Sequence, residues 1–139
     1  MPDTQAAKKV VRAFYESYNQ KDLDTSFDTY ISTKLVNHSM GGAYDRAAWL
    51  DLEKTLFPAF DDFAMTVLDQ VAEGDKVATR FRLGGTHTGA FYGIHASGNT
   101  AFLTATTIDR VVDGQIVERW AELDFGAFLQ QLSAPTPSE

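Results

Sequence analysis

The sequence contains no cysteine, so neither a disulfide framework nor a thiolate site is available to the protein. Basic residues are few compared with acidic ones: 12 Lys and Arg stand against 19 Asp and Glu, which gives a net charge of −7. Nucleic-acid-binding surfaces need clustered Lys and Arg, and this balance argues against one. No apolar run approaches the roughly 20 residues of a membrane-spanning helix. We therefore expect no nucleic-acid partner and no membrane partner.

The N-terminus lacks the long apolar stretch of a secretory signal, and we expect a soluble cytoplasmic protein. A chain of 139 residues is long enough for a single core. We expect one domain over residues 1–132, with no internal repeat. The remaining residues 133–139 read SAPTPSE, a composition typical of a disordered tail.

The first half of the chain has the spacing of amphipathic helices. We predict a first helix that Thr4 caps and that runs to about Asn19, a second over residues 24–30, and a third that Asp45 caps and Pro58 ends. The apolar residues that recur at helical spacing are Ala7, Val10, Val11, Phe14 and Tyr18 in the first helix, and Ala48, Trp49, Leu52 and Leu56 in the third. A short strand is expected over residues 35–38, before the Gly41-Gly42 turn.

From Phe63 the apolar period changes to two, which indicates strands. The clearest strand covers residues 76–88, with a possible bulge or sharp bend at Gly84-Gly85 and a Gly-rich loop over 88–99. Two more strands, 104–111 and 116–123, are followed by a short helix that the Asp124 carboxylate is expected to cap. Helices followed by an antiparallel meander make an α+β domain, and a curved sheet wrapped around helices leaves a cone with one open end, a natural pocket.

The turn at Asp113-Gly114 allows two registers for the last two strands. A two-residue loop pairs Val112 with Gln115, whereas a three-residue loop with Gly114 in a bulge pairs Val111 with Gln115. The three-residue loop puts one set of side chains on a common face: Leu103, Ala105, Thr107, Asp109, Val117, Arg119, Ala121 and Leu123. The opposite face then carries Phe102, Thr104, Thr106, Ile108, Ile116, Glu118, Trp120 and Glu122. Alternation alone does not choose between the registers, because neither face is purely apolar.

Two segments carry a family resemblance: GDKVATRFRLGGTHTGAFYGI at 74–94 and IDRVVDGQIVERWAELDFGAFLQQL at 108–132. They resemble the SnoaL-like polyketide cyclases, and the resemblance extends over residues 10–132. It implies the nuclear-transport-factor-2-like cone fold: a cone-shaped α+β barrel with three N-terminal helices packed in a curved, mainly antiparallel sheet. It also implies a pocket on the concave face and a homodimer through the convex face.

The same resemblance implies a small-molecule enzyme that works without metal or cofactor. Such cyclases close a ring by intramolecular aldol condensation: a carboxylate removes a proton next to a carbonyl, and pocket donors stabilise the enolate. Aligned on the D-G-x-I turn and the D-F…Q-L helix, the family's catalytic aspartate falls on Ala121, and its polar neighbours, a glutamine and a histidine, fall on Ala105 and Thr107. Their shared face favours the three-residue hairpin loop. Ala121 cannot transfer a proton, so a non-catalytic binding protein for a small hydrophobic ligand, or a hydrolase or isomerase on the same fold, stays open beside the cyclase-like enzyme.

Three residues are the catalytic candidates. His87 and His38 carry imidazoles whose ordinary pKa of about 6.5 suits an acid or base at neutral pH. Arg119 faces inward in the favoured register, where its guanidinium can bind an enolate oxygen. Each residue also has a structural alternative. His87 can fix the Gly-rich loop, His38 can lie at the pocket rim without a catalytic role, and Arg119 can pair with Asp109. No close ligand spacing such as H-x-x-x-H is present, so we expect no metal.

The ligand is expected to be small and hydrophobic or polyketide-like. The residues predicted to contact it are Tyr18, Trp49, Phe81, Leu83, Leu103, Ala105, Thr107, Ala121 and Leu123. Trp120 and Ile116 are predicted on the convex face. An exposed Trp is most simply covered by a second copy of the chain, which favours a homodimer.

Overall fold

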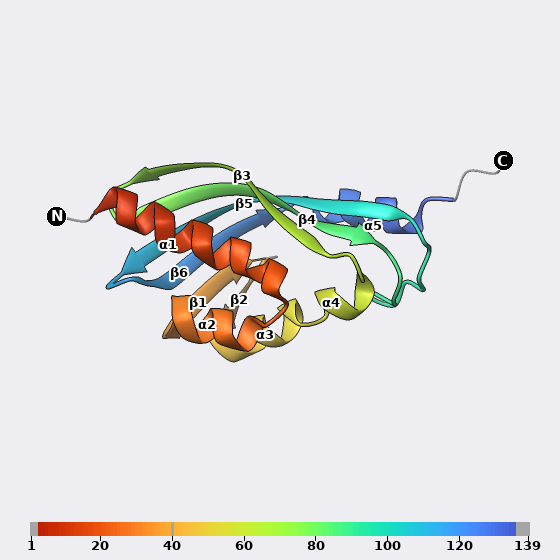
Figure 1. Cartoon of the computed structure of the whole chain (residues 1–139), viewed down its shortest axis with the longest axis horizontal. Helices are drawn as coiled ribbons and strands as arrows, with labels where there is room; N and C mark the ends of the chain where they lie inside the picture. Colours follow the sequence, from red (N-terminus) through yellow and green to blue (C-terminus); the bar gives the residue numbers. More distant parts are fainter. Residues whose placement is uncertain (1–2, 40, 136–139) are drawn as a thin grey trace.

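The computed structural model describes residues 3–39 and 41–135, and it shows a mixed α+β chain whose six-stranded sheet curves around the N-terminal helices (Figure 1). The predicted fold class is confirmed. The elements follow in the order α1 (Thr4–Ser17), η1 (Tyr18–Gln20), α2 (Leu23–Tyr30), β1 (Ile31–Ser39), β2 (Gly42–Asp45), α3 (Arg46–Glu53), α4 (Leu56–Ala59), β3 (Ala64–Glu73), β4 (Lys76–Thr86), β5 (Thr100–Val112), β6 (Gln115–Leu123) and α5 (Phe125–Ser133).

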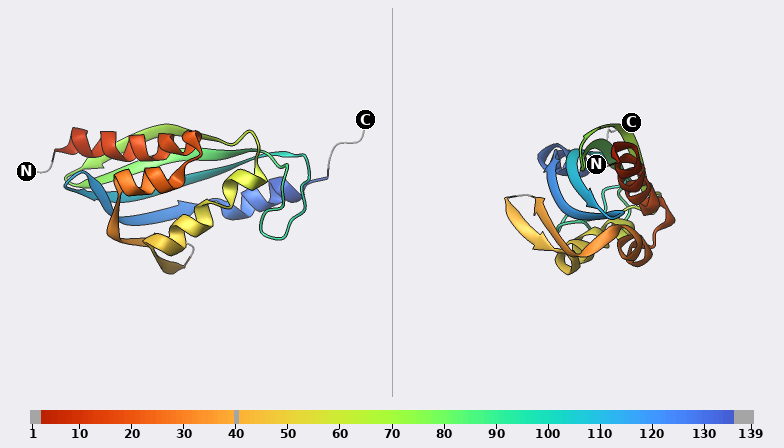
Figure 2. Two further views of the ribbon diagram at one scale, coloured as in Figure 1. Left: turned by 60° about the horizontal axis from the view of Figure 1, so that its bottom comes forward. Right: turned by 90° about the vertical axis from the view of Figure 1, so that its left-hand side faces the viewer.

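Helix α1 lies along the length of the sheet, as the left view of Figure 2 shows, and buries Val11, Phe14 and Tyr15. Its N-cap is Asp3, whose Oδ1 accepts from the Ala6 N–H at 3.0 Å, and not Thr4 as predicted. The reason is positional: Thr4 already has helical geometry, so a residue with extended backbone before it has to supply the acceptor.

The helix predicted between Asp45 and Pro58 is two helices, α3 and α4. Asp45 caps α3 as expected, accepting from the Ala48 N–H at 2.8 Å. Pro58 does not end a helix but lies inside the single turn of α4, where a missing N–H costs no hydrogen bond. Because the helix breaks after Glu53, α3 can stay packed on β1 and β2 while the chain changes direction toward α4.

The strands run in the order β2-β1-β6-β5-β4-β3, with β1 parallel to β6 and every other pair antiparallel. β1 is longer than the predicted 35–38 strand, and β2, which was not predicted, pairs with it as an edge strand. In the right-hand view of Figure 2 the sheet wraps around the helices as an open, unclosed curve.

The last hairpin has the two-residue loop, because Val112 pairs with Gln115, and the favoured three-residue loop is wrong. The register then slips at a bulge: Val111 pairs with Ile116, but Arg110 pairs with Glu118, which leaves Val117 as the extra residue. The bulge restores the predicted alternation, so the side chains from Leu103 to Asp109 and from Arg119 to Leu123 share a face as predicted. Their partners across the ladder differ from the prediction by two residues. Thr107 pairs with Ala121, Asp109 with Arg119 and Ala105 with Leu123.

The bulge also overturns one predicted orientation. Ile116 is fully buried and not on the convex face, because it precedes the extra residue and therefore has the opposite parity. Gly84 and Gly85 show no bulge, since the β4–β5 ladder runs through both without a slip. They are glycines because of close approach: a Cβ on Gly84 would lie 2.1 Å from the Ala101 carbonyl oxygen, and one on Gly85 2.4 Å from Asp62 Oδ1.

Helix α5 covers the part of β5 that extends beyond the end of β6. The Gln131 side chain replaces the missing strand, accepting from the Phe102 N–H at 2.8 Å and donating to the Phe102 carbonyl at 3.2 Å. Asp124 occupies the N-cap position, but its carboxylate makes no capping hydrogen bond, contrary to the prediction. Of the predicted tail, Ser133 is still helical, and residues 136–139 lie outside the described residues. In the described part of the chain, no helix has the length and apolar character to span a membrane.

Candidate active site

A cavity of about 320 Å³ opens between the inner face of the sheet, α3, α5 and the 88–99 loop. Its wall is mostly apolar and aromatic: Trp49, Leu52, Leu56, Phe81, Leu83, Phe91, Leu103, Leu123, Phe125 and Phe128. The polar residues on the wall are Asn37, Ser39, Tyr44, Glu53, Thr55, Tyr92 and Arg119. Ligand pockets usually measure about 300–1,000 Å³, so this cavity suits a compact hydrophobic molecule.

Five of the nine predicted ligand contacts line this cavity: Trp49, Phe81, Leu83, Leu103 and Leu123. The other four, Tyr18, Ala105, Thr107 and Ala121, are buried but do not line it. Ala121 instead lines a neighbouring depression together with His38, Ser39 and Trp120. A ligand role for any of the nine stays a prediction.

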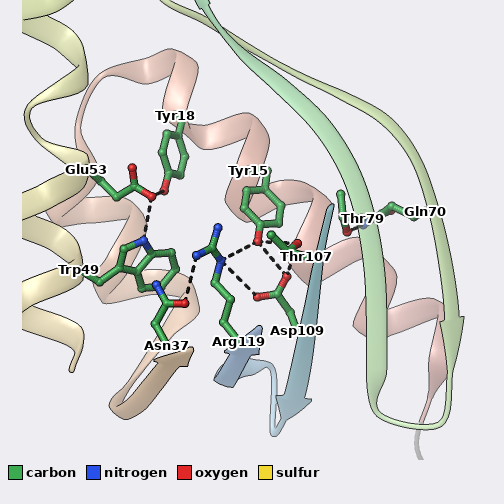
Figure 3. A network of polar contacts seen from close by, with 10 residues as sticks. All are labelled: Tyr15, Tyr18, Asn37, Trp49, Glu53, Gln70, Thr79, Thr107, Asp109 and Arg119. Atoms are coloured by element: carbon green, nitrogen blue, oxygen red, sulfur yellow. Dashed lines mark hydrogen bonds and ion pairs between the residues drawn. The ribbon is translucent and has the colours of Figure 1, made fainter. Parts of the chain in front are cut away.

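A polar network lies at the inner end of the cavity and joins α1 to three strands (Figure 3). Arg119 of β6 donates from Nε to the Tyr15 hydroxyl at 3.1 Å and from Nη1 to Asn37 Oδ1 at 3.1 Å. The Tyr15 hydroxyl lies 2.9 Å from both Thr107 Oγ1 and Asp109 Oδ2. The bulge at position 117 creates this network, because it sets Arg119 directly across the ladder from Asp109.

Asp109 is a completely buried acid in this network. Its Oδ2 accepts from Tyr15 and Thr107, while its Oδ1 lies 4.0 Å from Arg119 Nε and has no hydrogen-bond donor among the described residues. Burial raises the pKa of Asp109 to about 6, although the positive charge of Arg119 acts in the opposite direction. For Arg119, burial acts to lower the pKa, but the neighbouring Tyr15 and Asp109 outweigh it and the net shift is upward. The guanidinium is therefore a permanent buried cation.

Arg119 also reaches the cavity wall. Its Cζ lies 4.7 Å from the centroid of the Trp49 ring, a cation–π contact that holds the guanidinium plane. No described residue accepts a hydrogen bond from its Nη2, and in Figure 3 this nitrogen carries no dashed line. Arg119 thus combines the predicted pairing with Asp109 and a free donor that a ligand can use.

The last residue of α3, Glu53, also lines the cavity. Its Oε1 accepts two hydrogen bonds, from Trp49 Nε1 at 2.8 Å and from the Tyr18 hydroxyl at 3.0 Å. Burial raises the pKa of Tyr18 well above its ordinary value, and the negative charge of Glu53 raises it further, so Tyr18 is a neutral donor. Glu53 was not among the residues predicted from the sequence. The available signal was its place four residues after Trp49, on the same helix face.

The predicted histidines lie elsewhere. His87 is fully buried and does not line the cavity. Its Nδ1 accepts from the Ser97 N–H at 3.2 Å, its backbone N–H donates to the Asn99 carbonyl, and its carbonyl accepts from the Gly98 N–H. These contacts fix the Gly-rich loop, the structural alternative considered above. The His87 Nε2 is buried without a partner among the described residues.

His38 lies on the outer face of the sheet, because the preceding residue of β1, Asn37, points inward. Its Nε2 is 2.9 Å from Glu118 Oε2, and its ring stacks on Trp120 with centroids 5.5 Å apart. The hydrogen bond from His38 lowers the pKa of Glu118. Catalytic roles for His38 and His87 stay predictions, and neither residue contacts the cavity.

Trp120 is half-buried on the outer face as predicted, opposite Ile108 in the ladder and with Lys76 Nζ 5.5 Å from its ring. The homodimer that this face suggested stays a prediction. Within residues 3–39 and 41–135, no group of three or more His, Asp or Glu side chains is placed to hold a metal ion.

Comparisons with known proteins agree on the fold. A family model described as SnoaL-like polyketide cyclase matches residues 8–132. No curated protein matches the chain. Among solved structures, AclR, a proposed hydroxylase from Streptomyces galilaeus, is 25% identical, with 96% of this chain and 100% of AclR covered and a TM-score of 0.86. IdmH, a proposed polyketide cyclase from Streptomyces antibioticus, is 32% identical, with 92% and 99% covered and a TM-score of 0.80.

Proposed function

The chain belongs to the SnoaL-like polyketide cyclase family, and from that premise we propose that it is a small-molecule enzyme acting next to a carbonyl group. The substrate is compact and hydrophobic or polyketide-like, because the cavity is small and its wall mostly apolar. Proton removal and return next to a carbonyl need a base and an oxyanion donor, both of which side chains can supply.

The observation that carries this proposal is the Arg119 guanidinium. It is 4% exposed, it lines an apolar cavity, and its Nη2 has no acceptor among the described residues. When a proton leaves the carbon next to a carbonyl, negative charge collects on the carbonyl oxygen. A preorganised cation in a low-dielectric site stabilises that charge much more than water does. Arg119 is held for this role by Asn37, Tyr15 and Trp49.

A second candidate function is a binding protein without chemistry. The observation that favours it is Ala121, which stands where the resemblance places the family's catalytic aspartate. A mostly apolar cavity with Arg119 on its wall can hold a hydrophobic carbonyl compound and leave it unchanged. The two functions differ in whether the bound ligand exchanges the proton next to its carbonyl with solvent.

The oxyanion role can be tested with 2-naphthol, an aromatic alcohol whose ionised form mimics an enolate. We expect Arg119 to favour the naphtholate, so the pKa of the bound naphthol, followed by fluorescence, falls below that of free naphthol. Arg119→Gln removes the charge and should weaken naphtholate binding about 10- to 100-fold, as expected for a charge-assisted hydrogen bond of about 1.5–3 kcal/mol.

Two further variants control this test. Arg119→Lys keeps a buried positive charge but loses the guanidinium hydrogen bonds. It shows whether a loss of naphtholate binding comes from the charge or from these hydrogen bonds. Arg80→Gln removes an exposed arginine that pairs with Asp69, and should leave naphthol binding unchanged. An unshifted pKa of naphthol bound to the wild-type protein would contradict the oxyanion site.

A further inference from the structure

We propose that Glu53 is the general base of this site. It takes the proton from the carbon next to the carbonyl that Arg119 binds. This inference rests on the proposed function and specifies its chemistry. It differs from the family pattern, because it moves the carboxylate from the last strand to the end of helix α3.

The cavity wall leaves one choice of acid. Among the described residues that line it, Glu53 is the only carboxylic acid. Asp109 lies behind Arg119, completely buried and away from the wall. Glu118 lies on the outer face with His38. A base on the cavity wall is what proton transfer needs, because it has to come within hydrogen-bond reach of the substrate.

The neighbours of Glu53 hold it as a base. Trp49 Nε1 and the Tyr18 hydroxyl both donate to Oε1, so two neutral donors hold the carboxylate in position. Its second oxygen, Oε2, accepts no hydrogen bond from the described residues and is not among their buried unpartnered atoms. One oxygen therefore anchors the group, and the other is free to accept a proton.

Trp49 also sets the distance between the base and the cation. Its indole N–H binds Glu53, and its ring lies against Arg119. The Trp49 side chain therefore links the base to the cation, as Figure 3 shows, and among the described residues the ion pair of Arg119 is with Asp109 and not with Glu53. Because both residues line the same cavity, a ketone whose oxygen accepts from Arg119 Nη2 can turn its neighbouring carbon toward Glu53.

The proposed step accounts for every proton and electron pair. Glu53 Oε2 takes the proton from the carbon, the electron pair of the broken C–H bond forms a C=C bond, and the carbonyl π electrons move to oxygen. The enolate oxygen is stabilised by Arg119, and the protonated Glu53 then returns the proton to the same or another carbon. Removing such a general base costs about 10²–10⁴ in rate.

The test uses 2-tetralone, a bicyclic ketone, as a probe in D₂O, with deuterium uptake at the carbons next to the carbonyl followed by NMR. Glu53→Gln is nearly isosteric and keeps an oxygen acceptor for Trp49 and Tyr18, so its fold should persist. We expect the protein-catalysed exchange to fall about 10²–10⁴-fold. Binding of 2-naphthol should be retained, because Arg119 is intact.

Glu118→Gln is the matched control, since it removes a carboxylate from the outer face, and its exchange rate should equal the wild-type rate. Tyr18→Phe takes one donor from Oε1 but leaves the base; it should slow exchange less than Glu53→Gln does. Wild-type-like exchange in folded Glu53→Gln overturns the role of Glu53 and leaves the enzyme proposal standing with another base. Absence of exchange in the wild-type protein while 2-tetralone is bound overturns both and supports the binding protein.

Discussion

Asp109 and Arg119 form a buried pair in which the acid is incompletely satisfied. Among the described residues, donors reach only Oδ2 of Asp109, and its Oδ1 lies 4.0 Å from Arg119 Nε. Burial therefore raises the pKa of Asp109 from 3.8 to about 6. Between these two values the folded protein holds a proton that the unfolded chain has released. A proton bound only by the folded state stabilises it, so this contribution is complete below pH 3.8 and is lost as the pH rises through about 6.

Asp109→Asn removes the titrating carboxyl group, so comparison with the wild type isolates the contribution of Asp109 to stability. The free energy of unfolding of the wild type, measured by urea unfolding, should fall relative to that of Asp109→Asn as the pH rises from about 4 to about 6. The full change is about 1.4 kcal/mol for each pKa unit between the unfolded and folded values. Other acids titrate equally in both proteins and cancel. Parallel curves over this range would show that Asp109 has an ordinary pKa.

Helix α3 carries both Trp49 and Glu53, so its stability bears directly on the site. Asp45 starts it with a capping hydrogen bond of 2.8 Å to the Ala48 N–H. Asp124 stands at the same position of α5 without such a bond: its backbone has φ −80° and ψ 59°, whereas Asp45 has an extended backbone with φ −78° and ψ 174°. Asp45 therefore caps its helix through its side chain, whereas Asp124 does not.

These two caps provide a matched comparison. Asp45→Ala should lower the free energy of unfolding by about 1 kcal/mol, as is usual for a lost N-cap, whereas Asp124→Ala should change it much less. Both values come from chemical denaturation at neutral pH. Asp45→Ala should in addition slow 2-tetralone exchange, because fraying of α3 displaces Glu53. Equal losses of stability in the two variants would mean that Asp124 caps α5 in solution.

The elements were largely predictable from the sequence, because periodicity and turn residues are local signals. The helices near 4–19 and 24–30, the long strands and the α+β class all follow from them. The bulge at Val117 was not predictable, because only the packing of Ile116 and Arg119 on one face selects it. Glu53 was missed for a similar reason: the sequence places it on an amphipathic helix, and the tertiary packing of Trp49 and Tyr18 turns it into the cavity.

At the scale of the whole molecule, the outer face of the sheet has apolar groups that the chain itself leaves partly uncovered. Ile108 is 41% exposed and pairs with Trp120 across β5 and β6, and Val71 on β3 is 70% exposed. Charged groups surround them, including the Arg110–Glu118 pair at 3.4 Å. An apolar centre with a polar rim is the usual pattern of a protein interface.

We therefore predict a homodimer through this face, with Trp120 at or near the contact. Sedimentation at micromolar concentration should give twice the mass of the 15.4 kDa chain. Ile108→Lys should give a folded monomer, because a charge at the apolar centre has to be desolvated in the dimer. Thr33→Lys, an exposed position on β1, is the control and should leave the mass unchanged. A wild-type monomer with Trp120 open to solvent would end the idea.

The parallel pairing of β1 with β6 has a consequence for how the chain acquires its shape. Ile31 meets Ile116 in that pair, and Val36 meets Glu118, so the inner edge of β1 has no neighbour until most of the chain exists. Contacts of such long sequence separation close large loops and slow the folding reaction. During synthesis, β1 and the apolar faces of α1 and α2 have to wait for the C-terminal third of the protein. Nascent chains that stop short of β6 therefore present an open strand edge, which is the kind of surface that chaperones cover and that aggregation recruits.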